Sequence, residues 1–307
     1  MAPPPSRRLA ELRAPQVGTL VGSRSILVQP VGAIEQHGPH LPLATDLLIA
    51  EACADALVDR HGDELDLWLL PPLAYSKSNE HAWSSGTIWL SASTLLSVLD
   101  DLGRCVAMLP TPRAPSPKLV FLNGHGGNSA LLNVACRELR LRHGLTTFLA
   151  HPGVPPDQGG ESAPGEHGMG VHGGHDETSM VLHLRPDLVD LGAARRNVPA
   201  ALVENRHVRF GGRVSFGWLS DDFGPDGLIG DPTGATAAHG QRLVEGSIAT
   251  LAEAFREIAD FELPTDHDTP VGPSPAPASL EAHRRELEAL TGGNRTDPRP
   301  DTAPDAP

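Results

Sequence analysis

The sequence predicts an α/β fold built on a largely parallel sheet that helices cover on both faces. Two observations support this fold class. Short apolar runs, which are typical of buried strands, alternate with longer runs whose apolar residues recur every three or four positions, as in amphipathic helices. Such alternation places neighbouring strands in parallel and their connecting helices on the faces of the sheet. A chain of 307 residues can bury a full core of this kind.

The predicted elements follow in order along the chain. The strands, each a short apolar run, span residues 25–31, 67–70, 118–122 and 146–150. The helices span residues 47–58, 93–108 and 129–142, then a segment that begins within 171–179 and ends near residue 184, and finally a long helix with an apolar stripe of Ile248, Leu251, Phe255 and Ile258.

Three further features are predicted between these elements. Residues 211–218 are expected to form a strand or a hairpin arm, and the Gly- and Pro-rich residues 153–170 a mobile surface loop. Asn128 is expected to cap the helix that follows it. Glu80 and His81 follow the second strand and are either pocket-lining residues or a surface pair.

Composition argues against several classes of function. The formal net charge of −14 leaves no excess of Lys and Arg for binding nucleic acid or an anionic membrane. No apolar run approaches the roughly 20 residues that cross a bilayer, and the N-terminus lacks the apolar core of a signal peptide. Cys53, Cys105 and Cys136 are odd in number and form no CxxC pair, so we expect buried, reduced thiols in a cytoplasmic protein.

Residues suited to metal chemistry gather in three segments, each a strand end or loop with glycines that leads into a helix. In open α/β sheets, ligands bind in the crevice outside the carboxyl ends of the strands. Histidines and carboxylates gathered there suit one or two divalent metals, and imidazole favours Zn²⁺ or Mn²⁺ over Ca²⁺. The segments supply Glu35, His37 and Asp46, then His125 within NGHGGN, then His172 and Glu177.

Taken singly, each of these residues also has an ordinary structural role, and spacing alone leaves these roles open. They are a helix cap for Asp46 or Thr45, a loop ion pair for Glu35 and His37, a turn residue for His125, solvated loop positions for His172 and His175, and a first-turn helix acid for Glu177.

Five motifs, in their order along the chain, resemble those of the creatininase (creatinine amidohydrolase) family over residues 18–262. They are VGAIEQHGPHLPLATD, SNEHAWSSGT, FLNGHGGN, HGGHDETS and DGLIGDPTGAT. The resemblance implies a single three-layer α/β/α domain and a metal-dependent hydrolase of carbon–nitrogen bonds other than peptide bonds, often assembled as a homohexamer. The family includes creatininase, a formamide hydrolase of flavin and deazaflavin biosynthesis, and a peptidase that matures the mycofactocin precursor.

Carried over residue by residue, the resemblance implies a metal centre with two ions. Creatininase itself has a Glu two residues after the histidine of NGH, where this chain has Gly127, so creatinine is not the expected substrate. His40 is expected only to shape its loop. The implied ions are Zn²⁺ and/or Mn²⁺, with Fe²⁺ a third candidate. The implied ligands are Glu35, His37, Asp46 as the bridge, His125 and Glu177, and the implied proton carriers are His172 and Glu177.

The expected function is hydrolysis of a small amide, a cyclic amide or a formamide by metal-activated water. Two alternatives remain open: a peptidase that matures a modified precursor peptide of the mycofactocin type, and a non-catalytic metal-binding assembly subunit. The expected partners are a small-molecule amide substrate and further copies of the chain. The expected domains are an N-terminal arm at residues 1–17, the hydrolase domain at 18–262, and a Pro-rich disordered tail at 263–307.

Overall fold

Four parallel strands lie at the centre of the computed structural model, which describes residues 4, 6–109, 116–154 and 160–263. Within these residues the strand order is β2-β1-β3-β4, and all three strand pairs are parallel. This confirms the predicted largely parallel sheet. The strands are β1 (Ile26–Val31), β2 (Leu67–Leu69), β3 (Lys118–Asn123) and β4 (Thr147–Ala150).

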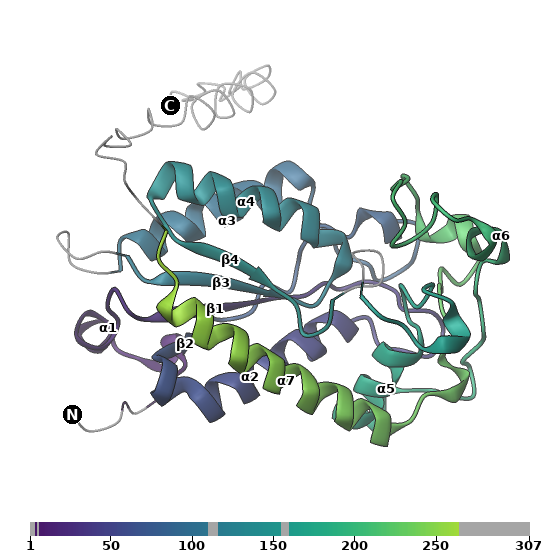
Figure 1. The fold of residues 1–307 in the computed structure, drawn as a ribbon, viewed down its shortest axis with the longest axis horizontal. Coiled ribbons are helices and arrows are strands. Elements are labelled where there is room, and N and C mark those ends of the chain that lie inside the picture. The colour runs from purple at the N-terminus through teal and green to yellow at the C-terminus, as the bar shows by residue number, and fades with distance from the viewer. Residues whose placement is uncertain (1–3, 5, 110–115, 155–159, 264–307) are drawn as a thin grey trace, which may run out of the picture. The chain divides into compact units, whose positions relative to one another are not determined.

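Helices cover both faces of this sheet, as predicted (Figure 1). On one face α2 (Thr45–Leu65) and α7 (Ala237–Asp260) pack against alternate strand residues such as Val28 and Val120. On the other face α3 (Ala92–Ala107) and α4 (Ser129–His143) pack against the residues between them, such as Leu27 and Phe121. Because both faces are covered, the central strands are mostly apolar, with Gln29 a buried polar exception in β1, which is why they appear as apolar runs.

The order of the strands creates a crevice between β1 and β3. After β1 the chain forms α2 and then β2, which lies on one side of β1. It then forms α3, which connects β2 to β3 on the other side of β1. Val31 and Asn123, the last residues of the two strands, lie opposite each other in the register. The loops that follow both strands therefore start at the same edge of the sheet, at a topological switch point where α/β proteins bind ligands.

The structure describes further helices besides the four that cover the faces of the sheet. Among them, α5 (His175–Leu184) packs along α7, and Gly240 of α7 approaches the backbone of Ser179 so closely that a Cβ atom would overlap it. The others are α1 (Ala14–Leu20), α6 (Ala200–Glu204) and the 3₁₀ turns η1 (Leu9–Glu11), η2 (Asn79–His81), η3 (Gly126–Asn128), η5 (Pro164–Glu166), η6 (Pro186–Leu188), η7 (Ser220–Phe223) and η8 (Pro232–Gly234).

One prediction for the connecting segments was wrong, and a second was wrong only in part. Residues 211–218 form no strand, and only an isolated bridge joins Val208 and Val214. Phe216 and Trp218 instead pack with other aromatic rings, so the apolar residues here indicate a small core rather than a strand. Of the segment predicted as a surface loop, residues 155–159 lie outside the described residues, and Met169 is fully buried.

Other expectations need smaller changes. Cys53 is buried as predicted, but Cys136 is half-buried and Cys105 is exposed on α3. Within the predicted N-terminal arm, Arg7 and Arg8 attach the chain to the domain through ion pairs with carboxylates of α2 and of the residue after it. Residues 264–307 of the predicted tail lie outside the described residues, and the domain boundaries stay a prediction. Among the helices that the structure describes, none combines the length and the apolar character needed to cross a membrane.

Candidate metal centre

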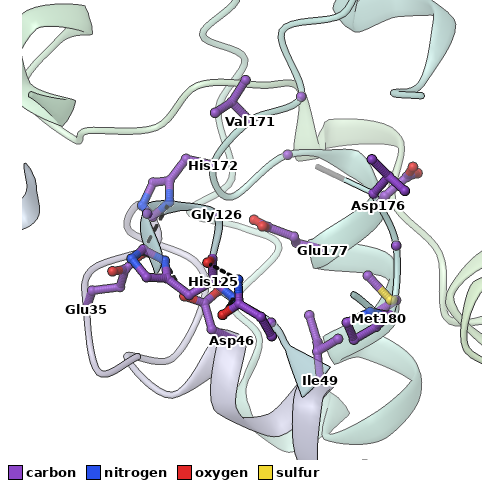
Figure 2. Close-up of a pocket in the computed structure, with 18 of the residues that line it drawn as sticks. Glu35, Asp46, Ile49, His125, Gly126, Val171, His172, Asp176, Glu177 and Met180 are labelled. Atoms are coloured by element: carbon purple, nitrogen blue, oxygen red, sulfur yellow. Dashed lines mark hydrogen bonds and ion pairs between the residues drawn. The ribbon is translucent and has the colours of Figure 1, made fainter. Parts of the chain in front are cut away.

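Four segments bring the predicted site residues together at the carboxyl edge of β1 and β3 (Figure 2). Glu35 and His37 lie in the loop after β1, and Asp46 lies in the first turn of α2. His125 lies in the loop after β3. His172 lies just before α5, while Glu177 projects from the first turn of that helix into the same cavity.

Asp46 presents a different carboxylate oxygen to each of two groups of side chains. Its Oδ1 lies 2.9 Å from His37 Nε2, and its Oδ2 lies 3.0 Å from His125 Nδ1. Glu35 joins the His125 group, and Glu177 joins the His37 group, with the ligand atoms of each group within 4.8 Å of one another. A carboxylate placed in this way can bridge two ions.

The hydrogen bonds of the two histidines fix which ring nitrogen faces the carboxylates. The Nδ1–H of His37 donates to the Glu35 carbonyl at 3.2 Å, and the Nε2–H of His125 donates to the Lys77 carbonyl at 3.0 Å. In each neutral ring the other nitrogen then carries only a lone pair. Both lone pairs point at Asp46, so each histidine needs a proton or a metal ion between its nitrogen and the facing oxygen of Asp46.

Buried acceptors without partners support the fit of a metal. Among the described residues, both side-chain oxygens of Glu35 and the Oδ2 of Asp46 have no hydrogen-bond partner, although both residues are almost fully buried. An unsatisfied buried carboxylate is costly, and coordination to a metal is one way to satisfy it. The donor set of imidazole and carboxylate suits Zn²⁺ or Mn²⁺.

The charges of these groups shift their pKa values strongly in the metal-free protein. Burial opposes protonation of His37, but the charge of Asp46 and the hydrogen bond to it raise the pKa of the ring to about 10. Burial likewise opposes protonation of His125, but the charge of Glu35 raises the pKa of His125 well above its usual value. Burial raises the pKa of Glu35 well above its usual value. Protons on the two histidines therefore occupy the positions that a metal would take.

His172 and Glu177 line the cavity beside this group. The Nε2–H of His172 donates to the Gln36 carbonyl at 2.5 Å, which leaves Nδ1 as an acceptor 3.7 Å from Glu35. Burial, with the charges of neighbouring histidines, lowers the pKa of His172 well below its usual value. Burial raises the pKa of Glu177 to about 7, although His37 opposes this shift. A neutral imidazole and a carboxyl that titrates near neutrality are both suited to moving a proton.

Sequence reasoning gave no definite role to three residues that the fold places in this cluster. The Gln36 amide nitrogen faces His81 Nδ1 at 3.0 Å, and His81 Nε2 lies 3.3 Å from Glu35 Oε1 without forming a hydrogen bond to it. Glu80 Oε1 lies 3.4 Å from His125 Nε2. The SNEH motif marked Glu80 and His81 only as pocket or surface residues, and Gln36 carried no signal beyond lying between Glu35 and His37.

One predicted helix cap was wrong, and a second residue occupies its predicted cap position without making a capping bond. The N-cap of α2 is Ala44, so Asp46 and Thr45 lie inside the helix, and the carboxylate of Asp46 faces the histidines instead. Asn128 occupies the N-cap position of α4, but its side chain makes no capping bond. Its amide nitrogen donates to Ser76 Oγ and its amide oxygen accepts from the Lys77 N–H.

His40 and a second histidine cluster have structural explanations. His40 is buried, and its Nε2 lies 2.9 Å from Thr178 Oγ1, which docks the loop onto α5 as expected of a loop-shaping residue. Outside the main site, His175 and His239 both contact Asp176 Oδ1. These contacts are ordinary hydrogen bonds and ion pairs, and Arg242 donates to the remaining nitrogen of His239, where a positive charge disfavours an ion.

The cavity in front of the cluster has a volume of about 390 Å³. Its floor holds the carboxylates and histidines, and its wall carries the apolar side chains of Ile49, Val154, Phe216, Trp218 and Leu243. A site of this size accommodates a ligand larger than a single small amide group.

Comparison with known proteins identifies the family. The family model described as "Creatinine amidohydrolase" matches residues 10–255. The chain belongs to the creatininase family. This confirms the resemblance seen in the motifs and places the chain in a family of hydrolases, while cleavage of bonds other than peptide bonds stays a prediction.

Creatininase-family relatives with two different descriptions are similar to this chain. The mycofactocin precursor peptide peptidase of Mycobacterium ulcerans is 39% identical over 225 residues, which cover 71% of this chain and 79% of that protein. The creatinine amidohydrolase of Pseudomonas putida is 32% identical over 194 residues, which cover 57% of this chain and 70% of that protein.

Solved creatininases share the fold. A mutant creatininase described as type II is 26% identical, with a TM-score of 0.61 over 82% of this chain and 98% of that chain. Two further solved creatininases, each 24% identical and with TM-scores of 0.60 and 0.61, are described as a Zn-Zn type and as a Mn form. The shared fold agrees with the three-layer α/β/α architecture seen in Figure 1.

Proposed function

We propose that this chain is a metal-dependent hydrolase that cleaves an amide bond of a precursor peptide. The observation that carries the metal part is the pair of histidine lone pairs aimed at Asp46 beside the partnerless oxygens of Glu35. Either a proton or a metal ion between each histidine and Asp46 resolves this arrangement, and with metal ions in place such a site supports metal-assisted amide hydrolysis.

Two groups of residues would hold two divalent ions. Asp46 would serve both groups because its two oxygens face different histidines. When bound, the ions would act as Lewis acids and make water a nucleophile near neutral pH. The remaining ligands would be Glu35 and His125 in one group, and His37 and Glu177 in the other.

The chain's own residues would then manage the proton. The free Nδ1 of His172 faces the cluster, and its Nε2 is held by the Gln36 carbonyl, so the ring can accept or donate a proton at one defined atom. Glu177 is fixed by the Gly173 N–H, which donates to its Oε2 at 2.6 Å. We assign proton transfer to the leaving nitrogen to His172, because Glu177 also serves as a ligand.

Three observations favour a peptide over a small amide as the substrate. The cavity of about 390 Å³ is lined by Phe216 and Trp218 besides the proposed ligands, so it offers apolar surface to side chains of a peptide. The relatives named as mycofactocin precursor peptide peptidases are 36–39% identical and are matched over a larger share of this chain than the creatinine amidohydrolase. Gly127 also replaces the Glu expected of creatininase itself.

A panel of substrates tests the proposal. The purified chain, loaded with Zn²⁺ or Mn²⁺, is incubated with creatinine, a formamide, simple lactams and short peptides with apolar residues, and the products are measured by mass spectrometry. We expect cleavage of peptides and little turnover of creatinine. Turnover of small amides alone would support the small-amide alternative. Metal binding without turnover of any member would favour a binding subunit.

His125→Ala tests the metal centre directly. The substitution removes one ligand of the group formed by Glu35, Asp46 and His125, so we expect loss of the ion in that group and a fall in activity of more than about a hundredfold, since a metal contributes several kcal/mol to the transition state. Metal content is measured by elemental analysis, and folding by circular dichroism.

His143→Ala is the matched control, because His143 pairs with Asp100 at the end of α4, away from the cavity. This variant should keep both metal and activity. Full metal content and full activity in His125→Ala would contradict the proposed centre.

A further inference from the structure

Glu80 occupies space that is available only because residue 127 is a glycine. A Cβ atom at position 127 would overlap Glu80 Oε1, and it would also come within 2.5 Å of His125 Nε2. The carboxylate of Glu80 is almost fully buried, and it enters this space from η2, a segment distant in sequence from the NGHGGN loop. A carboxylate is therefore present beside His125 although the NGHGGN loop itself supplies none.

The position of Glu80 relative to the imidazole defines what it can do. Glu80 Oε1 lies 3.4 Å from His125 Nε2, whereas His125 Nδ1, on the other side of the ring, faces Glu35 and Asp46. The same Nε2 also donates its hydrogen to the Lys77 carbonyl oxygen, at an N–O distance of 3.0 Å. Glu80 thus contacts the nitrogen that faces away from the proposed ion. Carboxylates in this position fix the ring orientation of metal-binding histidines and increase their basicity.

The surroundings hold Glu80 in place and keep it charged. Lys77 Nζ lies 2.7 Å from its Oε2, so one oxygen pairs with the ammonium group while the other is free to face His125. The backbone of this segment is anchored by Asn128, whose amide oxygen accepts from the Lys77 N–H, and by Ser220, whose hydroxyl donates to the Glu80 carbonyl. The fold therefore sets the position of the Glu80 carboxylate through these contacts.

We propose that Glu80 is a positioning residue of the metal centre: it holds His125 with Nδ1 toward Glu35 and Asp46, and the glycine at position 127 admits it. This inference rests on the metal centre proposed above and goes beyond it, because Glu80 belongs to no predicted ligand set. The ordinary alternative is that Glu80 only forms an ion pair with Lys77.

Cobalt binding tests the proposal without reference to activity. Co²⁺ is titrated into the metal-free forms of wild type, Glu80→Ala, Glu80→Gln and Lys77→Gln, and both the dissociation constant and the visible absorption spectrum of bound Co²⁺ are recorded. We expect Glu80→Ala to weaken binding by about 10- to 100-fold, as loss of such an outer partner of a ligand typically does. Glu80→Gln should lose less, since its amide oxygen can still accept from His125.

Two controls separate positioning from general effects. Glu245→Gln removes an exposed carboxylate that pairs with Arg60, and it should leave Co²⁺ binding unchanged. In a His125→Ala background, Glu80→Gln should not weaken the remaining Co²⁺ binding further, because Glu80 acts through His125. Thermal unfolding of each metal-free variant identifies any that fail to fold.

The outcomes distinguish the two proposals. If wild type binds no Co²⁺, the proposed metal centre fails. If wild type binds Co²⁺ and Glu80→Ala binds it equally well with an unchanged spectrum, the role of Glu80 alone is overturned. Equal losses in Lys77→Gln and Glu80→Ala would assign the effect to the ion pair and would also overturn it. An added loss from Glu80→Gln in the His125→Ala background would contradict action through His125.

Discussion

At the scale of single residues, the site depends on which ring nitrogen of each histidine faces a carboxylate. His37 uses Nδ1 and His125 uses Nε2 to hold a backbone carbonyl, so the opposite nitrogens face Asp46. This choice is made by carbonyl groups of Glu35 and Lys77, one local and one distant in sequence. Local sequence therefore predicts that a histidine can bind a metal, but the fold decides through which atom.

Metal affinity should rise with pH around neutrality. In the metal-free protein Asp46 and Glu35 raise the pKa values of His37 and His125, that of His37 to about 10, so both rings bind protons near pH 7. A metal must displace these protons, so its apparent affinity increases as they are lost, by about tenfold per pH unit for each proton released. Co²⁺ titrations from pH 6 to 8, with proton release measured in weak buffer, check this. An affinity independent of pH, with no proton release, would contradict it.

Residue types in the sequence predicted much of this centre, though not its outer contacts. Glu35, His37, Asp46, His125, His172 and Glu177 come together in one cavity, which the motifs and the family resemblance led us to expect. Their roles stay proposals. His81, Gln36 and Glu80 escaped a definite assignment because their contacts join segments far apart in the chain, and no local pattern records such contacts.

At the scale of elements, periodicity located the strands and most helices well. The four strands begin and end within about one residue of the predicted ranges, since burial on both faces gives an unmistakable apolar run. The helix predicted at 47–58 extends to Leu65. The prediction ended too early because the last turns are more polar and carry Asp59 and Asp63, which pair with Arg8 and Arg7. Residues 211–218 misled the prediction because their aromatic residues pack with Phe210 and Phe223, while the backbone forms only the isolated bridge at Val214.

Two glycines of α7 should respond in opposite ways to substitution by alanine, because only one of them lies at the contact with α5. Gly240→Ala places a Cβ on the backbone of Ser179, so it should destabilise the fold by about 1–3 kcal/mol, as overpacking does. It should also weaken metal binding by displacing Glu177 on α5. Gly246 is exposed with open space around it, so Gly246→Ala should stabilise the fold by about 0.5–1 kcal/mol through helix propensity.

Urea unfolding monitored by circular dichroism measures both effects. Because the two substitutions are identical in chemistry and lie in one helix, their difference isolates the contact with α5. A Gly240→Ala variant as stable as Gly246→Ala would show that the two helices separate without cost, which the close approach contradicts.

At the scale of the whole molecule, the sheet brings several carboxylates to one buried point. Glu35 and Asp46 are each nearly inaccessible to solvent, and Glu80 and Glu177 lie beside them. The location of this point was predictable, because the switch between β1 and β3 follows from the order of alternating elements. The homo-oligomer and the cytoplasmic location depend on what lies outside this chain, and both stay predictions.

Bound metal should therefore stabilise the folded protein as a whole. A ligand that binds only the folded state adds about 2.7 kcal/mol at a free concentration one hundred times its dissociation constant. We expect a higher unfolding temperature with Zn²⁺ or Mn²⁺ and a lower one after treatment with a chelator, measured by scanning calorimetry. The shift should be smaller in His125→Ala and unchanged in His143→Ala. Identical unfolding temperatures with and without metal would argue against an ion at this site.

The separation of the site residues along the chain has a consequence for biosynthesis. Glu35, His37 and Asp46 leave the ribosome early, His125 follows, and Glu177 emerges last, after all four strands of the sheet. A growing chain thus displays one complete group of proposed ligands, while the other group lacks Glu177 until α5 has been made. Capture of the full complement of metal then belongs to the final stage of synthesis, when α5 and α7 dock and close the nascent protein around its site.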